Sequence, residues 1–315
     1  MSPCIIPNYM RSRCCHSLKI CGMTNGKITG GRSQWLQTIV QHHFPGTWKQ
    51  QSRLNLMSEL EISVVSVNGY PCRVWQKGTG EPIGYLAGLA GLPKWPAFAE
   101  ALAVNHKVIA PSIPGFPGAE GHRELDTTLD WIVAMRELLN GANLEGPPLV
   151  GVSIGATLAA EIAAMWPHKV DKLVLVAPFG IYDELHPTAS PWAQQGHEFG
   201  SLFCNNSDAY SDFIRRPNDA DPVEWPIEMA RAREASARLL WPMGDTRIIR
   251  RLHRIICPTL IVWGADDRVI PKSYAEKFAE AISGPTEIVE IPNAGHLVDL
   301  DQPEALAKEV LTFLG

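Results

Sequence analysis

The sequence has no run of 18 apolar residues, and this absence argues against a transmembrane helix. The longest candidate, residues 149–166, contains Ser153 and Glu161. A strong compositional bias is also missing, since 45% of the 315 residues are apolar and 19% are charged, as in ordinary globular proteins. This balance excludes disorder over most of the chain. It provides the apolar side chains for one large α/β domain with an insertion, or for two average domains.

Metal and nucleotide signatures are missing as well. The seven cysteines form no Cys-x-x-Cys pair, and no Cys and His residues have the spacing of a zinc site. There is no Gly-x-Gly-x-x-Gly or P-loop motif, and no set of acidic residues is spaced for a hard metal ion. We therefore expect no cofactor and no metal. Cys72, Cys204 and Cys257 are isolated in the chain, which is typical of buried, reduced thiols in an intracellular protein.

Acidic residues are absent from residues 1–56, which carry seven lysines and arginines. The remaining chain has 21 basic and 33 acidic residues, a net charge of −12, which argues against a nucleic acid partner. A basic, acid-free start is typical of a mitochondrial or plastid transit peptide. Because no amphipathic helical stripe is present, we favour a poorly ordered extension before a functional start at Met57 over a transit peptide. We expect a cytoplasmic protein, or an organellar one if residues 1–56 are a transit peptide.

From residue 61 onward, strands and helices are predicted to alternate along the chain. Apolar runs such as 173–177 and 260–263 are typical of strands buried on both faces. Alternation of this kind predicts an α/β fold with a mostly parallel central sheet and helices on both sides. The predicted strands are 61–67, 71–76, 83–87, 107–110, 147–152, 173–177, 260–263 and 287–291, and the predicted helices are 95–103, 125–139, 153–166 and 303–314.

Residues 179–250 interrupt this alternation between two core strands. They contain six prolines and a helical stretch at 228–241. This pattern predicts an inserted helical cap, so that residues 57–178 and 251–315 together form the α/β core. Near the start of the core, Asn68-Gly69 is the signal for a tight hairpin between the first two strands.

The sharpest chemical signal is Gly151-Val152-Ser153-Ile154-Gly155, which lies directly between an apolar strand and a helix rich in small residues. Strand, tight turn and helix are the context that a nucleophile elbow requires. The turn forces Ser153 into a strained conformation, and the flanking glycines let the strand and the helix approach closely. The helix N-terminus then directs its amide groups and positive dipole end at charge that develops near Ser153.

A serine hydroxyl needs a base, and the base needs a carboxylate to orient it. His296 directly follows the last predicted strand, at the same sheet edge as Ser153, where α/β sheets build their sites. Asp266 and Asp267 follow the strand at 260–263. Because adjacent side chains in a loop point apart, we expect only one of these carboxylates to face His296.

Three segments together resemble the α/β-hydrolase superfamily over about residues 60–315. They are the elbow, the sequence Trp-Gly-Ala-Asp-Asp-Arg-Val-Ile-Pro at 263–271, and Ala-Gly-His ahead of Asp-Gln-Pro-Glu at 294–304. The chain most resembles the capped serine esterases and carbon–carbon bond hydrolases. The resemblance implies a Ser153, Asp267 and His296 triad, with Asp266 as the alternative acid. It excludes the haloalkane dehalogenase and epoxide hydrolase branches, which carry an aspartate at the position of Ser153.

The loop after the third strand departs from this pattern, because Ala87 stands where relatives usually carry the histidine of a His-Gly pair. Backbone amides supply the donors of an oxyanion hole, so we expect the N–H groups of Leu89 and Ile154 in that role. Arg215, Arg216, Arg231 and Arg233 are predicted surface charges, any one of which is also a candidate for a substrate carboxylate. The residues predicted to line the substrate pocket are Gly88, Val152, Phe116, Trp192 and Trp241.

These features predict a cofactor-independent serine hydrolase that cleaves a small carboxylic ester or lactone through an acyl-enzyme. One alternative is a carbon–carbon bond hydrolase that acts on diketones from aromatic-ring cleavage, since the same triad serves both reactions. A non-enzymatic ligand receptor built on a hydrolase fold is the other alternative. A small molecule is the expected partner, and the sequence does not distinguish a monomer from a homodimer.

Overall fold

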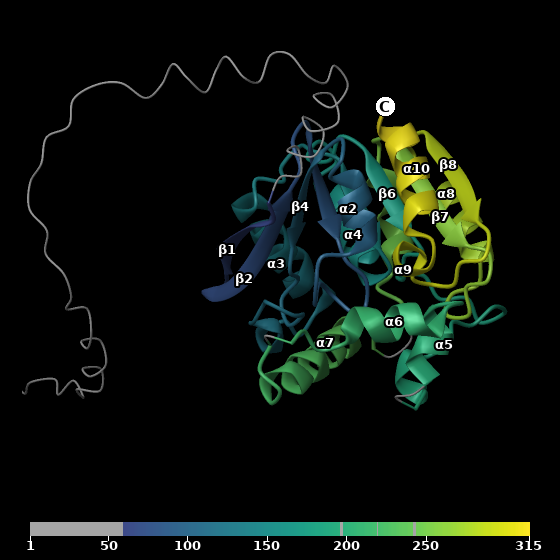
Figure 1. The fold of residues 1–315 in the computed structure, drawn as a ribbon. Coiled ribbons are helices and arrows are strands. Elements are labelled where there is room, and N and C mark those ends of the chain that lie inside the picture. The colour runs from purple at the N-terminus through teal and green to yellow at the C-terminus, as the bar shows by residue number, and fades with distance from the viewer. Residues whose placement is uncertain (1–58, 196–197, 219, 242–243) are drawn as a thin grey trace, which may run out of the picture. The chain divides into compact units, whose positions relative to one another are not determined.

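A computed structural model describes residues 59–195, 198–218, 220–241 and 244–315, all within the compact unit Leu54–Gly315. The predictions for residues 1–56 and for a start at Met57 lie outside the described residues. The described residues form one eight-stranded sheet in the order β1-β2-β4-β3-β5-β6-β7-β8 (Figure 1). Its strands are β1 (Glu61–Val67), β2 (Tyr70–Lys77), β3 (Pro82–Leu86), β4 (Lys107–Pro111), β5 (Leu149–Val152), β6 (Leu173–Val176), β7 (Thr259–Gly264) and β8 (Thr286–Ile291).

The first two strands form the predicted hairpin. Asn68 and Gly69 both have positive φ, 50° and 84°, as the favoured two-residue hairpin turn requires. β1 and β2 pair in an antiparallel register that matches Val67 with Tyr70, and β2 pairs antiparallel with β4. All the remaining pairs are parallel, so the sheet is mostly parallel, as predicted.

Helices cover both faces of this sheet. α2 contacts α10 on one face, while α3 contacts α4 on the other. The helices are α2 (Ala97–Leu102), α3 (Thr128–Gly141), α4 (Ile154–Met165), α5 (Phe199–Phe203), α6 (Ser207–Ile214), α7 (Glu224–Leu240), α8 (Ser273–Ala281), α9 (Val298–Asp301) and α10 (Pro303–Leu314). Short 3₁₀ turns lie at His122–Glu124, Pro191–Ala193, Ile248–Arg250 and Leu252–Arg254. The α/β-hydrolase fold predicted from the sequence is therefore confirmed.

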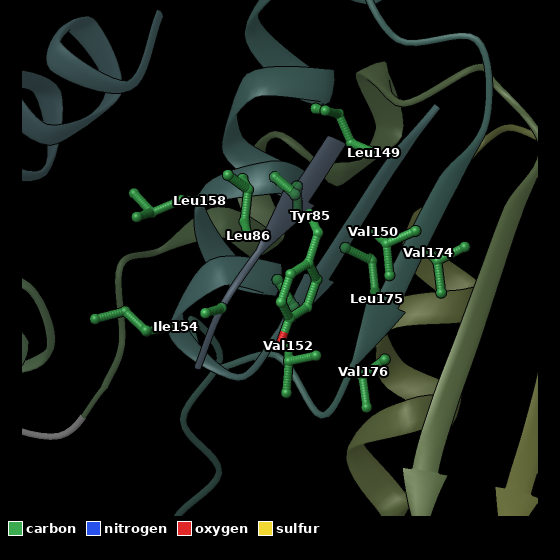
Figure 2. Packing of buried hydrophobic residues seen from close by; sticks show 14 of the residues in the cluster. Tyr85, Leu86, Leu149, Val150, Val152, Ile154, Leu158, Val174, Leu175 and Val176 are labelled. Atoms are coloured by element: carbon green, nitrogen blue, oxygen red, sulfur yellow. The ribbon is translucent and has the colours of Figure 1, made fainter. Parts of the chain in front are cut away.

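The core is centred on β5 and β6, whose residues are all buried. Figure 2 shows their Val and Leu side chains packed around Tyr85 of β3 and against Ile154 and Leu158 of α4. α4 is almost wholly buried, which explains its run of alanines, because small side chains let a helix lie close to a sheet. This packing fixes the junction between β5 and α4, where Ser153 lies.

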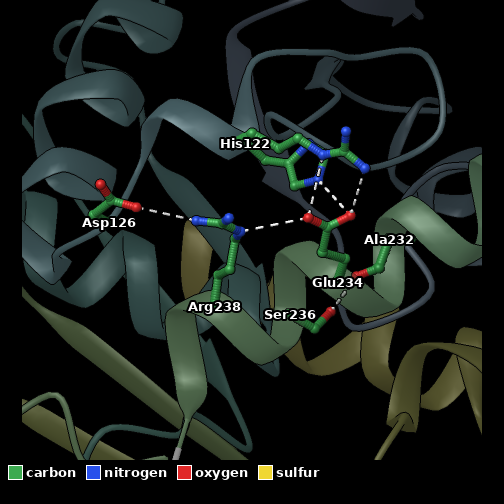
Figure 3. A network of polar contacts seen from close by, with 7 residues as sticks. His122, Asp126, Ala232, Glu234, Ser236 and Arg238 are labelled. Carbon is green, nitrogen blue, oxygen red and sulfur yellow. Dashed lines mark hydrogen bonds and ion pairs between the residues drawn. The ribbon is translucent and has the colours of Figure 1, made fainter.

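The connection between β6 and β7 carries α5, α6 and α7 and is called the insertion below. The helix predicted at 228–241 begins earlier, at Glu224, and ends at Leu240. Its residues Glu234 and Arg238 form ion pairs with Arg123 and Asp126 of the loop before α3, and Glu234 also lies 3.4 Å from His122 Nε2 (Figure 3). No helix among the described residues is long and apolar enough to cross a bilayer.

Candidate active site

Ser153 occupies the turn between β5 and α4 with backbone angles φ 54° and ψ −118°. Such a conformation costs a non-glycine residue about 1–3 kcal/mol and persists only where the surrounding structure imposes it. A Cβ atom on Gly151 would lie 2.6 Å from the backbone nitrogen of Ala156, and one on Gly155 would lie 2.6 Å from the carbonyl oxygen of Ala87. Gly151 therefore permits the close approach of β5 and α4, and Gly155 permits α4 to lie against the end of β3, so that Ser153 is held at the carboxyl end of β5.

The structure brings Ser153, His296 and Asp267 into one hydrogen-bonded line. Ser153 Oγ lies 2.8 Å from His296 Nε2, and His296 Nδ1 lies 3.0 Å from Asp267 Oδ2. The other carboxylate oxygen of Asp267 accepts hydrogen bonds from the N–H groups of Val269 and Ile270, at 2.8 and 3.0 Å. Both oxygens of this carboxylate are thus occupied, and their contacts fix its orientation toward His296.

Asp266 has a different environment from its neighbour. It is exposed, and its carboxylate accepts a hydrogen bond from the side-chain amide of Asn205 at 2.6 Å. The structure therefore directs the carboxylate of Asp267, and not that of Asp266, toward His296.

Aromatic rings enclose the imidazole of His296. The rings of Phe179 and Phe203 lie with their centroids 5.3 and 6.2 Å from that of His296. Ser153 and His296 are both 0% exposed. Because Phe203 belongs to α5, the insertion forms part of the wall around His296. This enclosure lowers the local dielectric constant and strengthens the hydrogen bonds of His296.

The loop after β3 passes directly beside Ser153. A Cβ atom on Gly88 would lie 3.3 Å from the Cβ atom of Ser153 and 2.9 Å from Cδ2 of Leu297, so glycine permits this close approach of the loop. Within the described part of the chain, no hydrogen bond occupies the N–H group of Leu89 or that of Ile154. Two backbone donors are thus free near the Ser153 side chain.

Arg73 of β2 holds this loop, a contact that the sequence analysis missed. Its guanidinium donates to the carbonyl oxygens of Leu92 and Pro117 and lies 3.8 Å from the centroid of the Trp75 ring. It therefore joins the loop that carries Leu89 to the loop after β4. An arginine within a strand has no sequence signal for this role, because the carbonyl groups that it binds lie in distant loops.

The predicted pocket residues lie in different surroundings. Trp192 lines a cavity of about 30 Å³ together with Leu89, Phe203 and five other residues of the insertion. Gly88 lies beside Ser153, and Val152 is buried in the core. Phe116 is also buried, against Gly91. Trp241 is 67% exposed and meets Trp192 edge to face.

The four arginines predicted for the insertion also differ from one another. Arg215 pairs with Asp212, Arg231 lies 3.8 Å from Glu224, and Arg216 donates to backbone carbonyl groups. Arg233 has no ion pair with any described residue. Its guanidinium lies 5.0 Å from the centroid of the Phe199 ring and lines the same cavity as Trp192.

A buried acid, Asp299, lies three residues after His296 and was not predicted. Tyr85 donates a hydrogen bond to its Oδ2 atom at 2.7 Å, while its Oδ1 atom has no partner among the described residues. Burial raises the pKa of Asp299 to about 6, although the Tyr85 hydrogen bond and the nearby His296 oppose that rise. No group of three or more His, Cys, Asp or Glu residues in the described ranges is arranged to hold a metal ion.

Known proteins resemble this chain in sequence and in fold. The model of the "Alpha/beta hydrolase family" matches residues 67–309. BpoC of Mycobacterium tuberculosis, named as a non-heme bromoperoxidase, is 28% identical over 75% of this chain and 94% of its own. A 2-hydroxy-6-oxo-6-(2'-aminophenyl)hexa-2,4-dienoic acid hydrolase of Metapseudomonas resinovorans is 24% identical over 79% of this chain and 89% of its own.

Among solved structures, the chain resembles a 2-hydroxy-6-oxo-6-phenylhexa-2,4-dienoate hydrolase from Rhodococcus sp. strain RHA1. The TM-score is 0.65 at 18% identity, over 82% of this chain and 99% of the other, and at this identity the likeness concerns the fold. The family match extends over well more than half of the chain and includes the elbow and the loops of Asp267 and His296. The protein therefore belongs to the alpha/beta hydrolase family and is a hydrolase.

Proposed function

We propose that this hydrolase is a serine hydrolase that cleaves a small carboxylic ester or lactone through an acyl-enzyme. The observation that carries the proposal is the hydrogen-bonded line from Ser153 through His296 to Asp267. In the first step, Ser153 Oγ attacks the substrate carbonyl carbon while His296 Nε2 takes the hydroxyl proton. Asp267 accepts a hydrogen bond from Nδ1–H, which selects the imidazole tautomer and stabilises the imidazolium.

The attack converts the carbonyl oxygen into an oxyanion, which needs hydrogen-bond donors in the transition state. The unoccupied N–H groups of Leu89 and Ile154 fit this role, and Ile154 adds the positive end of α4. Collapse of the intermediate breaks the ester C–O bond, and His296 gives its proton to the departing alcohol. A water molecule, activated by the same imidazole, then releases the acid and restores Ser153.

Residues 179–250 are proposed to act as a cap over this site. Ser153 and His296 are fully buried, and the adjacent cavity of about 30 Å³ has room for about one water molecule. A substrate with a carbonyl group needs more space than this. We therefore expect part of the insertion to move away before the substrate reaches Ser153 and to close again before reaction, which would exclude bulk water from the intermediate.

The test is hydrolysis of p-nitrophenyl acetate, butyrate and octanoate by the wild type, Ser153→Ala and Ser66→Ala. Loss of the nucleophile is expected to lower kcat by about 10⁴-fold or more. Ser66 is an exposed residue of β1, so its variant should behave like the wild type. Turnover that survives in Ser153→Ala would refute the mechanism. Labelling of Ser153 by a fluorophosphonate without turnover of any substrate would instead support the receptor hypothesis.

Arg233 favours carbon–carbon bond hydrolysis as the second candidate. Its unpaired guanidinium lines the cavity beside Leu89 and Phe203, where it would bind a substrate carboxylate. The relative from Metapseudomonas resinovorans acts on a dienoic acid, which carries such a group. In this reaction, water is added across a C–C bond next to a ketone, and the products are a carboxylic acid and an enol that becomes a second ketone.

Arg233→Met and Arg231→Met distinguish the two candidates. Arg231 is a matched control, because it lies on the same helix and already has Glu224 as its partner. If the substrate is anionic, Arg233→Met should raise KM for a carboxylate-bearing substrate by about 10- to 100-fold, the loss expected for a charged hydrogen bond. KM for a neutral ester should change little in Arg233→Met, and KM for either substrate should change little in Arg231→Met. If Arg233→Met changes KM equally for charged and neutral substrates, Arg233 binds no substrate carboxylate, and only the esterase candidate remains.

A further inference from the structure

One turn of the insertion binds both loops that carry Asp267 and His296. The turn at 203–206 consists of Phe203, the last residue of α5, and the three residues before α6. On the histidine side, the carbonyl oxygen of Phe203 accepts a hydrogen bond from Leu297 N–H at 2.9 Å. A Cβ atom on Gly295 would lie 2.8 Å from the same oxygen, so the glycine before His296 permits this close contact.

The carboxylate of Asp301 strengthens the contact between the turn and the histidine loop. Its Oδ2 atom accepts the N–H of Gly295 and the N–H of Asn205, both at 2.7 Å, while Oδ1 accepts the N–H of Asn206 at 3.1 Å. Hydrogen bonds to a carboxylate are shorter and stronger than those between neutral groups. One side chain therefore ties the residue next to His296 to two residues of the insertion.

On the aspartate side, the contact is made by the side chain of Asn205. Its amide nitrogen donates to Asp266 at 2.6 Å, and its amide oxygen accepts from Arg268 at 2.7 Å. These two residues flank Asp267. Arg268 also donates to the carbonyl oxygen of Cys204 at 3.3 Å, so the turn holds both sides of Asp267.

We infer that Asn205 is a positioning residue, which aligns the Asp267 and His296 loops with each other from the insertion. This inference rests on the proposed function. The side chain of Asn205 is exposed, so its contribution to the stability of the fold is small. The alignment of catalytic groups, however, is sensitive to shifts of a fraction of an ångström. The inference also assigns different behaviour to two parts of the insertion. The turn at 203–206 stays bound to the Asp267 and His296 loops, and the segments after it move to admit the substrate.

Asn206 provides a matched control. It is an adjacent asparagine in the same turn, but its side chain caps α6 by accepting the N–H of Asp208 at 3.1 Å. Asn206→Ala should therefore lower the melting temperature without changing the reactivity of Ser153. Asn205→Ala should have the reverse effect, with the melting temperature nearly unchanged.

The experiment measures the second-order rate of fluorophosphonate labelling at Ser153, a readout that needs no known substrate, together with kcat and KM on a p-nitrophenyl ester. Asn205→Ala should slow labelling and lower kcat by about tenfold with KM nearly constant, because misplacement acts on the chemical step. Labelling of the Asn205→Asp variant should be slower still, since the new carboxylate faces the carboxylate of Asp266. The exchanged pair Asn205→Asp/Asp266→Asn restores one donor and one acceptor and should recover the rate to within about threefold of the wild type.

Three different results would overturn the inference. If wild-type Ser153 is labelled rapidly and Asn205→Ala is labelled equally fast, the positioning role is wrong while the proposed function stands. If wild-type Ser153 is not labelled and no ester is hydrolysed, the proposed function fails, and the inference fails with it. A failure of the exchanged pair to recover any rate would also refute the contact between Asn205 and Asp266 as the origin of the effect.

Discussion

Asp266 and Asp267 are neighbours of identical chemistry in opposite surroundings. The side chain of Asp267 is 0% exposed and has three hydrogen-bonding contacts, whereas Asp266 faces solvent. A carboxylate that orients an imidazole must be held in place, and only Asp267 is held in this way. The difference between the two residues provides a direct test of the proposed triad.

Asp267→Asn is expected to lower kcat by about 10⁴-fold, because an amide in this position favours the wrong imidazole tautomer. Asp266→Asn retains an oxygen that accepts from Asn205, so its effect should not exceed about tenfold. The measurement is kcat on a p-nitrophenyl ester for both variants, with circular dichroism spectra to check folding. A larger loss in Asp266→Asn than in Asp267→Asn would assign the acid to Asp266.

Asp299 makes the stability of the fold depend on pH. Burial raises its pKa from 3.8 to about 6 in the folded protein, while the unfolded chain keeps the ordinary value. Between these two values the folded state binds more protons than the unfolded state, so the free energy of unfolding falls as pH rises through this window. The fall approaches about 3 kcal/mol, since each pKa unit corresponds to about 1.4 kcal/mol.

Asp299→Asn removes this titration and should flatten the stability between pH 4 and pH 6, where the wild type loses stability. Urea unfolding at several pH values measures the effect as a difference between variant and wild type. The amide oxygen of asparagine still accepts the Tyr85 hydrogen bond, so the packing should be retained. Identical slopes of stability against pH in the two proteins would contradict a raised pKa at Asp299.

At the scale of elements, α4 is joined to the chain between α7 and β7 by an ion pair with a buried carboxylate. Arg251 donates two hydrogen bonds to Glu161, at 2.8 and 2.6 Å, and Thr246 donates a third at 3.0 Å. Glu161 is 1% exposed and Arg251 is 26% exposed. Helix α4, which begins directly after Ser153, is thus held by the chain that leads into β7.

Arg251→Met should lower the free energy of unfolding by about 3 kcal/mol, because it leaves the buried Glu161 carboxylate without its cation. Lys169→Met is the control, since Lys169 pairs with Glu145 at the surface and its loss should cost less than about 1 kcal/mol. Chemical denaturation measures both values. We expect kcat to remain close to that of the wild type in each variant, and equal destabilisation by the two substitutions would contradict the argument.

At the scale of the whole molecule, burial differs between the sheet and the insertion. β5, β6 and β7 consist entirely of buried residues, whereas α7 buries only one face. The ion pairs of α7 with the loop before α3 involve partly exposed residues of the helix, Glu234 with Arg123 and Arg238 with Asp126. Contacts of this kind are weaker than a packed core, which agrees with a cap that opens.

Hydrogen exchange measures this difference. Amides of β5 to β7 should exchange only through global unfolding, while those of α7 should exchange through local opening, at least about 100-fold faster. Helix α4 is the control, because it is also an α-helix but is buried on all sides. Its amides should exchange as slowly as those of the strands. Protection of α7 equal to that of β5 would show that the insertion belongs to the cooperative core, which would rule out its opening as a cap.

The sequence predicted every strand of the sheet to within two residues at either end, because buried strands between helices produce short apolar runs. It missed α5, α6, α8 and α9, which have four to nine residues. Helices of this length contain too few turns for a periodic pattern to stand out from a loop, and packing rather than local preference stabilises them. The predicted roles of residues 1–56 and the cellular compartment stay predictions.

Ser153 and His296 were predicted from the sequence alone because their signals are local: a glycine-flanked serine between strand and helix, and a histidine directly after the last strand. The choice between Asp266 and Asp267 rested on a resemblance, since both follow the same strand. Only the tertiary structure decided which carboxylate faces His296, which arginine of the insertion is unpaired, and which asparagine joins the two loops. These outcomes depend on contacts between segments about 30 to 100 residues apart, and a single sequence carries no local signal for such contacts.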